Sequence, residues 1–510
     1  MVTILMMFSI LTTGVFAATP YENYTYTEWS TSVPTPESYV PINTYTGSQM
    51  GTTNFKEPGD FCFGPDGRLY VLDSGNNRVV VFDSEMKFVK EYTSFTDPKA
   101  AGQQQAIVGA DGTVLNGSTE TTEDSTKVEV KSPSGIYVDR KNFIYVCDTE
   151  QSRVLKVDQD GKVVLTYTMP KDTTYSSQIF RPIKITVDEN DIAYILSESV
   201  YQGALVYDKD GNYMTFYGCP PVQVTAKIIL DRMWKKILSK DARSGIAAYV
   251  PVEFTSLFMD KKGFIYTCSS YTTQKVEQIR KLNFLGNNIY SFTGNFGEKD
   301  IVYEQGKGVY TNFIDICVDD ENFVIALDST RARVYIFDQD GNRLMTFGTI
   351  GSQIGTFRTP IAVETKNEKI YVLDKLKNNI TEFSLSEYGK LIRNAVELYN
   401  SGLYSEAQQP WNEVLKINSN CEMAYRGIGQ AMLKTGDYKQ AVEYFKLGYD
   451  RENESKAFDK YRAQVLRQNF GIVMFFIFVV AVFLFIITNY KIRRKIAAKL
   501  FKRNGRGGRK

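Results

Sequence analysis

The chain contains no histidine among its 510 residues. This absence excludes serine–histidine and cysteine–histidine nucleophile pairs, imidazole acid–base chemistry and every zinc site built on histidine. Proline is sparse, with 15 residues, and 43% hydrophobic beside 23% charged residues gives no bias towards disorder. Catalysis would have to use carboxylates, lysine, tyrosine or cysteine, and the sequence identifies no catalytic residue, metal ligand or cofactor site.

The six cysteines do not form the pattern of a disulfide framework. Cys147 and Cys268 occupy the same place in two internal repeats, and Cys62 and Cys317 share another place. The other repeats have leucine where Cys147 and Cys268 stand, which indicates that cysteine serves there as a small buried hydrophobe. We therefore expect these four thiols to be unpaired.

A repeated segment organises residues 39–385. An acidic residue, a short turn, then Arg or Asn and alternating apolar residues recur at 73–83, 148–158, 328–338 and 374–384, with looser copies from 197 and 269. Each copy follows another apolar strand, whose shared anchor positions are Tyr70, Tyr145, Tyr194, Tyr266, Ile325 and Tyr371. Four short antiparallel strands cannot bury both of their faces alone, whereas sheets stacked around an axis can. The pattern predicts an all-β six-bladed propeller.

Two details of the repeats refine this prediction. The last unit ends after its third strand at Ser384, and residues 39–48 resemble the outer strands of other units, so the N-terminal strand is predicted to complete the sixth blade. The Asp-x-Asp-Gly turns at 158–161, 208–211 and 338–341 resemble calcium loops. An apolar strand resumes directly after each glycine, however, which favours hairpin turns.

The repeats resemble those of NHL-repeat propellers, whose hallmark is an aspartate, a short turn and Asn-x-Arg-Val before a strand. Asp73, Asn76, Arg78 and Val79 match it fully, and the segment from Asp328 matches it partly. The resemblance implies the fold and no particular activity. Gluconolactonase-type propellers hold a divalent metal without strictly requiring histidine, but no convergent Glu-Asn-Asp set can be placed here. Amidating lyases on related propellers depend on histidine-bound zinc, which this chain lacks.

A ligand is expected at the mouth of the central channel, on the face reached by the loops after the second and fourth strands. Two large insertions, near 96–131 and 219–254, follow fourth strands, and the second contains a predicted helix at 224–240. This elaboration indicates a recognition surface, although the helix could equally cover its own blade. The candidate ligand-binding residues are Asp60, Arg181, Lys184, Asp315, Arg358 and Trp234.

The two ends of the chain predict a single-pass membrane protein. Residues 1–17 read as a signal peptide and 18–38 as a linker. Residues 470–490 are long and apolar enough to span a bilayer. The tail at 491–510 holds ten Lys and Arg residues and no acid, so the bulk of the chain is expected outside the cytoplasm. The same tail could also lie on the inner leaflet as a short amphipathic helix.

Between the propeller and the membrane the pattern becomes helical. Residues 386–452 resemble tetratricopeptide repeats, because an offset of 34 aligns glycine, tyrosine, alanine and aromatic positions. The aligned pairs are Gly402 and Gly436, Tyr404 and Tyr438, Ala407 and Ala441, and Trp411 and Phe445. Residues 453–469 are expected as a juxtamembrane helix. A rigid spacer and a peptide-binding groove both remain open for this segment.

Two classes of function follow. The first is a membrane-anchored extracytoplasmic binding or scaffold protein that recognises a protein partner, a carbohydrate or another small polar ligand. By resemblance to bacterial surface propellers, it would be accessory to a carbohydrate import system. The alternative is a surface-anchored, metal-dependent lactonase-like or lyase-like enzyme. RNA-binding NHL domains are basic and cytoplasmic, whereas this exterior part has 50 basic and 58 acidic residues, so no nucleic-acid partner is expected.

Overall fold

The computed structural model describes residues 19–27, 29–98, 126–173, 175, 179–219, 252–269, 277–290, 296–298, 302–304 and 307–504. The predicted signal peptide, the centres of both insertions, Trp234 with its predicted helix, and the last six residues lie outside the described residues. The contacts divide the chain into two units, Met1–Lys390 and Leu391–Lys510, which we describe separately.

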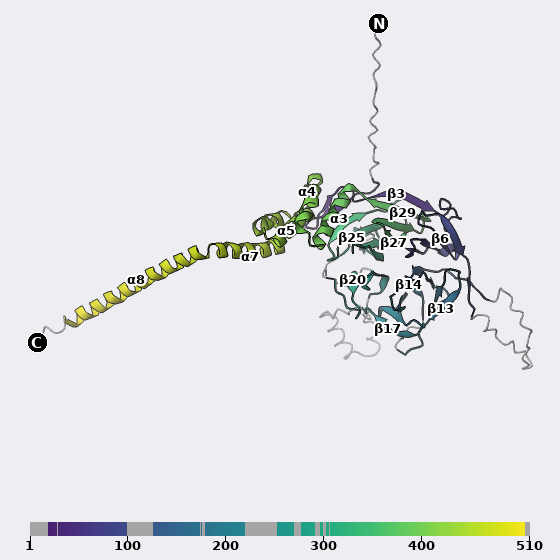
Figure 1. Ribbon diagram of the computed structural model, residues 1–510, viewed down its shortest axis with the longest axis horizontal. Helices are drawn as coiled ribbons and strands as arrows, with labels where there is room; N and C mark the ends of the chain where they lie inside the picture. Colours follow the sequence, from purple (N-terminus) through teal and green to yellow (C-terminus); the bar gives the residue numbers. More distant parts are fainter. Residues whose placement is uncertain are drawn as a thin grey trace, which may run out of the picture. The chain divides into compact units, whose positions relative to one another are not determined.

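Six antiparallel sheets in the first unit form the blades of a propeller around a common centre (Figure 1). Blades 1 to 3 comprise β4 (Asp60–Phe63), β5 (Leu69–Asp73), β6 (Arg78–Phe82) and β7 (Phe88–Tyr92); β10 (Gly135–Val138), β11 (Ile144–Asp148), β12 (Arg153–Val157) and β13 (Val163–Thr168); β14 (Pro182–Val187), β15 (Ala193–Ser197), β16 (Ala204–Tyr207) and β17 (Tyr213–Tyr217). Blades 4 to 6 comprise β18 (Phe254–Met259), β19 (Ile265–Ser269) and β20 (Ile279–Leu282); β23 (Phe313–Val318), β24 (Val324–Asp328), β25 (Arg333–Phe337) and β26 (Arg343–Phe347); β27 (Pro360–Lys366), β28 (Lys369–Asp374), β29 (Asn379–Leu385) and β3 (Tyr39–Thr46). The six-bladed prediction is confirmed.

The ring closes by pairing the two ends of the propeller sequence. β3 lies antiparallel to β29, with Tyr45 opposite Ile380 and Thr44 opposite Thr381. Tyr39, at the start of β3, is 1% exposed and packs against Phe347 with ring centroids 4.9 Å apart. The first strand therefore completes the last blade, as the sequence predicted.

The hydrophobic core consists of clusters that join consecutive blades. One cluster unites β5 and β6 of blade 1 with β11 and β12 of blade 2, and others join blades 2 and 3, 3 and 4, 4 and 5, and 6 and 1. Central strands such as β5 and β11 are buried along their whole length. Each blade thus buries its two faces against its neighbours. Polar and apolar residues therefore alternate less strictly along these strands than along strands of a sheet with one exposed face.

The aspartate that defines the repeat has a structural role. Asp73 is fully buried, accepts the Arg78 Nε–H at 2.8 Å and accepts the backbone N–H of Lys56 at 2.7 Å. Asp148 binds Arg153 and the Lys131 backbone in the same way. The aspartate of the repeat therefore connects the second and third strands to the loop that leads into the first strand. The repeat signature is thus a feature of the fold.

The Asp-x-Asp-Gly segments form hairpin turns. Asp158 Oδ1 accepts the backbone N–H groups of Asp160 and Lys162 at 3.0 and 2.8 Å, and Asp338 makes the equivalent bonds. The first carboxylate of each turn is therefore used to close the hairpin between the third and fourth strands. None of the six cysteines, all in the described part of the chain, forms a disulfide.

Residues 18–38, read as a linker from the sequence, contain a short hairpin of β1 (Tyr24–Tyr26) and β2 (Ser32–Pro34). The Tyr24 and Tyr26 hydroxyls donate to the two carboxylate oxygens of Glu298 at 2.5 and 2.6 Å. Arg333 and Arg343 lie over the rings of these tyrosines. Despite burial, Arg343 and the tyrosine hydroxyls hold the pKa of Glu298 below its usual value. This buried carboxylate anchors the hairpin to blade 5.

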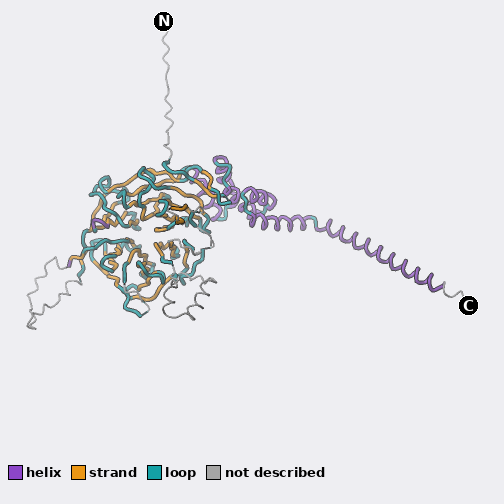
Figure 2. The backbone as a smooth tube through the Cα atoms, turned by 180° about the vertical axis from the view of Figure 1, so that it is seen from behind, coloured by secondary structure: helices purple, strands orange, loops and turns teal. Residues whose placement is uncertain are grey.

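Helices follow the strands of the propeller along the chain (Figure 2). They are α3 (Glu387–Asn400), α4 (Tyr404–Ile417), α5 (Glu422–Thr435), α6 (Tyr438–Leu447), α7 (Arg451–Gln468) and α8 (Phe470–Asn504). α4 and α6 begin 34 residues apart, and the aligned Ala407 and Ala441 are both fully buried. Trp411 packs against Gly427 and Phe445 against Gly429, where a Cβ would lie within 3 Å of the ring. Glycine therefore lets each aromatic ring approach the neighbouring helix closely.

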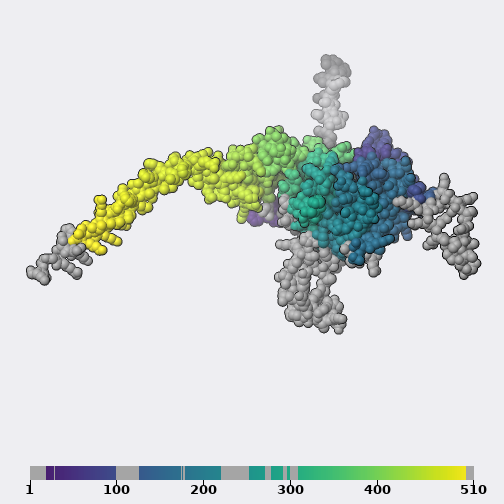
Figure 3. Space-filling view, turned by 60° about the horizontal axis from the view of Figure 1, so that its bottom comes forward, coloured from purple at the N-terminus to yellow at the C-terminus, as the bar shows by residue number. Residues whose placement is uncertain are grey.

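α8 is long and apolar enough to cross a membrane. The candidate span is Phe470–Leu500, and none of its most apolar stretch is buried by other parts of the protein (yellow in Figure 3). Such an uncovered apolar surface is costly in water and is typical of a bilayer-spanning helix. The helix continues through the basic residues that follow the apolar stretch, and α7 ends at Gln468, just before it begins.

Candidate functional site

Equivalent residues of the six innermost strands form two levels around the propeller axis. Two residues that lie directly opposite each other in neighbouring strands point to the same face of the sheet. The residue of each innermost strand that pairs with the anchor position of the second strand therefore occupies the same place in every blade. The anchor level comprises Cys62, Tyr137, Thr186, Phe258, Cys317 and Glu364. The lysine level, two positions earlier in each strand, comprises Asp60, Gly135, Lys184, Ser256, Asp315 and Ala362.

A single ammonium group lies at the centre of the lysine level. Lys184 Nζ donates to Asp60 Oδ1 at 2.8 Å and lies 3.2 Å from Asp315 Oδ1. The two carboxylates are almost completely buried, with side chains 1% and 3% exposed. Two buried carboxylates facing one ammonium leave a net negative charge in the channel.

The same two carboxylates connect the remaining blades. Asp60 Oδ2 accepts the backbone N–H of Ile136 at 3.0 Å, and Asp315 Oδ2 accepts that of Val363 at 2.8 Å. The Ser256 hydroxyl donates to Asp315 Oδ1 at 2.6 Å. Together with Lys184, these bonds reach the innermost strands of all six blades, so this cluster links the whole ring at its axis.

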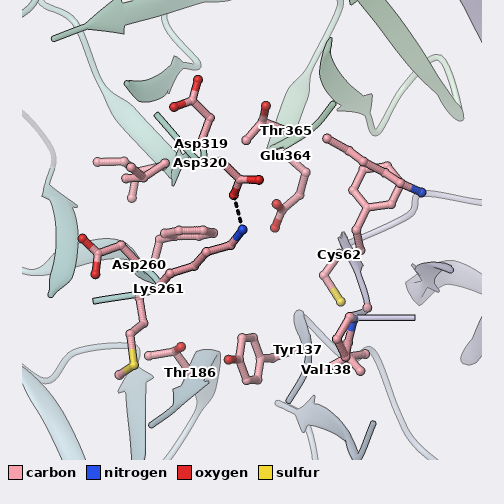
Figure 4. Close-up of a pocket in the computed structure, with 18 of the residues that line it drawn as sticks. Cys62, Tyr137, Val138, Thr186, Asp260, Lys261, Asp319, Asp320, Glu364 and Thr365 are labelled. Carbon is pink, nitrogen blue, oxygen red and sulfur yellow. Dashed lines mark ion pairs between the residues drawn. The ribbon is translucent and has the colours of Figure 1, made fainter. Parts of the chain in front are cut away.

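A cavity of about 630 Å³ lies beside this cluster. Its lining includes Lys184, Asp315, five residues of the anchor level and the turns that follow the innermost strands. Figure 4 shows Cys62, Tyr137, Thr186 and Glu364 around the opening. In an up-and-down blade these turns lie at the opposite end from the loops after second and fourth strands, where the insertions occur. The cavity is therefore at the other end of the channel from the predicted mouth.

Glu364 is the distinctive group of the cavity. Burial, reinforced by the neighbouring Asp315 carboxylate, raises the pKa of Glu364 to about 8, although Lys184 opposes this shift. Burial likewise raises the pKa of Asp60 to about 6 against the effect of Lys184. The Asp315 and Asp60 carboxylates hold the pKa of Lys184 above its usual value in spite of burial. At pH 7 the site thus combines a fixed ammonium with a carboxyl group that mostly keeps its proton.

The two thiols of the anchor level are not activated. Burial, together with the Glu364 carboxyl group, raises the pKa of both Cys62 and Cys317 well above the usual value. A thiol that keeps its proton is a poor nucleophile and metal ligand. In the described residues, no three Cys, Asp or Glu side chains are grouped so that they could hold a metal ion.

Replacing Glu364 by glutamine is expected to stabilise the protein at alkaline pH. The pKa of Glu364 is raised from 4.5 to about 8, so the folded protein binds this proton more tightly than the unfolded chain does. The wild type therefore loses stability progressively as the pH rises from about 4.5 to about 8, whereas glutamine cannot ionise. Urea unfolding should show the stability advantage of Glu364→Gln growing by up to about 4 kcal/mol between pH 5 and pH 9. Equal pH dependence in both proteins would contradict the assignment.

The structure brings together three of the six predicted ligand-binding residues, Asp60, Lys184 and Asp315. Arg181 is instead partly exposed and pairs with Glu198 at 2.6 Å. Arg358 is exposed, and its backbone N–H donates to Asp374. Neither arginine lines the cavity, and Trp234 lies outside the described residues.

Sequence reasoning missed Glu364, Thr186 and Tyr137. The signal was available, because each is the cross-strand partner of an anchor tyrosine already recognised in the repeats. Counting back from the anchors of all six units would have placed these residues on one level with Cys62. Their burial and the charge around them could not be deduced in this way.

Comparison with known proteins agrees with the fold. The family model of the NHL repeat matches residues 55–82, and a family described as a 6-bladed beta-propeller matches residues 311–469. A search of curated protein sequences finds no match to this chain.

Solved structures with similar folds are distant. Virginiamycin B lyase from Staphylococcus aureus is 11% identical with a TM-score of 0.38, covering 68% of this chain and 100% of its own. A protein of unknown function from Bacteroides thetaiotaomicron is 10% identical with a TM-score of 0.41, covering 70% and 79%. The extracellular domain assigned to a hybrid two-component system from B. thetaiotaomicron is 12% identical with a TM-score of 0.36, covering 68% and 42%.

These identities are too low to transfer an activity, since one fold hosts many functions. The blade count, the ring closure and the matched repeat nevertheless agree with one another. The chain is therefore a six-bladed β-propeller protein that carries an NHL repeat.

Proposed function

We propose that this protein is a membrane-anchored binding protein whose propeller recognises a small polar ligand outside the cytoplasm. The observation that carries the proposal is the cavity of about 630 Å³, in which Glu364 faces open space beside a buried ammonium. This volume suits a monosaccharide or disaccharide, and polar groups fixed on rigid strands are typical of small-molecule sites. α8 supplies the membrane anchor, and the basic residues after it favour a cytoplasmic C-terminus.

The setting that we propose is an accessory role beside a carbohydrate import system, with the helices α3–α7 as the contact region for a membrane partner. Stacked helix pairs present extended surfaces to other proteins. The full-length chain, used as bait in solubilised membranes, should retain an importer permease or substrate-binding subunit. Recovery of the bait without any importer subunit would contradict this setting.

Protease treatment of intact cells tests the orientation. We expect the propeller to be cleaved at its exposed loops, while the tail after Leu500 stays protected until the membrane is opened. A protected propeller with a digested tail would reverse the proposed topology.

The enzyme alternative is tested separately by metal titration of the full-length protein in detergent, because a metal-dependent lactonase-like enzyme must bind a divalent cation tightly. Saturable binding at one metal per chain would favour that alternative.

A further inference from the structure

The cavity contains unsatisfied polar groups that call for a ligand. Asp260 lines the cavity with Glu364, its side chain is buried, and its Oδ2 atom has no hydrogen-bond partner among the described residues. The Thr186 hydroxyl is 1% exposed and lies beside the Tyr137 phenol without a hydrogen bond of normal geometry to any described residue. Buried polar groups usually have partners, so two such groups lining one cavity point to a partner that is not part of the protein.

The charges around the cavity favour a cation over an anion. The groups that act on Glu364 are Asp315 on β23, Asp60 on β4 and Lys184 on β14, which makes three carboxyl groups against one ammonium. Two of the lysines at the rim, Lys261 and Lys366, already have acceptors. Lys261 Nζ lies 2.6 Å from Asp320, and Lys366 Nζ donates to the Gly67 carbonyl oxygen at 2.6 Å.

We propose that the ligand of this cavity is a small molecule that carries a protonated amine among its hydroxyl groups, such as an amino sugar. The inference rests on the binding function proposed above and specifies its ligand class. The ammonium pairs with Glu364, whose carboxyl group lines the cavity beside the buried Asp315 carboxylate. The Thr186 hydroxyl and the neighbouring Tyr137 phenol form hydrogen bonds with the hydroxyl groups of the ligand. Binding of the ammonium favours the carboxylate form of Glu364, so the protein releases a proton when the ligand enters.

Calorimetry with three sugars of one shape tests the inference on the full-length protein in detergent. Glucosamine, glucose and glucuronate present a cation, a neutral hydroxyl and an anion on the same ring. At pH 6.5 we expect glucosamine to bind about tenfold more tightly than glucose, the effect of one partly screened charge pair, and glucuronate to bind most weakly. At pH 7, titrations in two buffers of different ionisation heat should reveal proton release with glucosamine.

Two variants assign the effect to Glu364. Glu364→Gln should reduce the preference for glucosamine to about twofold or less and abolish the proton release. Glu85→Gln, an exposed acid that pairs with Lys87 on an outer turn of blade 1, should keep both. The melting temperature of Glu364→Gln serves as the folding control, since this variant is expected to be at least as stable as the wild type.

The outcomes separate the inference from the proposed function. Equal binding of glucose and glucosamine would overturn the amine inference and leave a sugar-binding propeller. Tightest binding of glucuronate would overturn it as well, because the anion would then be the preferred partner. No binding of any of the three sugars would contradict both the inference and the proposed small-sugar site.

Discussion

Lys184→Met should lower the free energy of unfolding by about 3–5 kcal/mol at pH 7. The substitution leaves the Asp60 and Asp315 carboxylates buried without their ammonium, and an uncompensated buried charge is among the most costly defects in a protein. Because these carboxylates connect the innermost strands of all blades, the loss should appear in one cooperative transition. Urea unfolding followed by tryptophan fluorescence or circular dichroism measures it.

Charge neutralisation provides the matched test of this explanation. Adding Asp60→Asn and Asp315→Asn to Lys184→Met removes the unpaired charges, so the triple variant should regain most of the lost stability. Lys209→Met removes an ammonium from an exposed pair with Asp210 and should change stability by less than about 0.5 kcal/mol. If Lys184→Met unfolded at the same urea concentration as Lys209→Met, the cluster at the axis would not stabilise the ring.

Removing β3 is the second change with a large expected effect. A variant that begins at Gly47 lacks the outer strand of blade 6, so the edge of β29 is left unpaired and the Phe347 ring loses Tyr39. Loss of one buried aromatic alone costs about 3–5 kcal/mol, and the whole ladder of β3 is lost with it. We expect the variant to be degraded rapidly by added protease and to show no sharp thermal transition.

A shorter truncation and a peptide provide the controls. A variant that begins at Thr35 loses the β1–β2 hairpin and its bonds to Glu298 but keeps β3, so it should retain a cooperative transition at a lower temperature. A peptide of residues 39–46 added to the Gly47 variant should restore protease resistance by strand addition. Equal melting temperatures for the wild type and the Gly47 variant would show that ring closure is dispensable.

The propeller could be predicted because its information is local and repeated. Each unit carries its own turn aspartates and anchor residue, and the incomplete last unit together with the extra first strand indicated how the ring closes. The candidate membrane span in α8 could equally be predicted, since a long apolar run without charged residues has few structural explanations. The N-terminal hairpin was missed because its stability comes from Glu298, more than 270 residues away.

The candidate site was only half accessible to prediction. Asp60, Lys184 and Asp315 were singled out as polar residues at the channel, but the sequence placed the ligand at the opposite end. Arg181 does not line the cavity because its side chain forms an ion pair with Glu198 at the surface. Counting back from Tyr371 would have placed Glu364 on the anchor level, but not its burial, since a single glutamate in a strand reads as an exposed residue.

The sequence alone therefore determined the number of blades, the closing strand, the helical segment and the candidate membrane span, because periodicity and long apolar runs act through neighbours in the chain. Tertiary structure decided which charges meet at the axis. Six strands spread over some 300 residues bring together one ammonium and three carboxyl groups, and only their mutual distances and burial determine which carboxyl group keeps its proton.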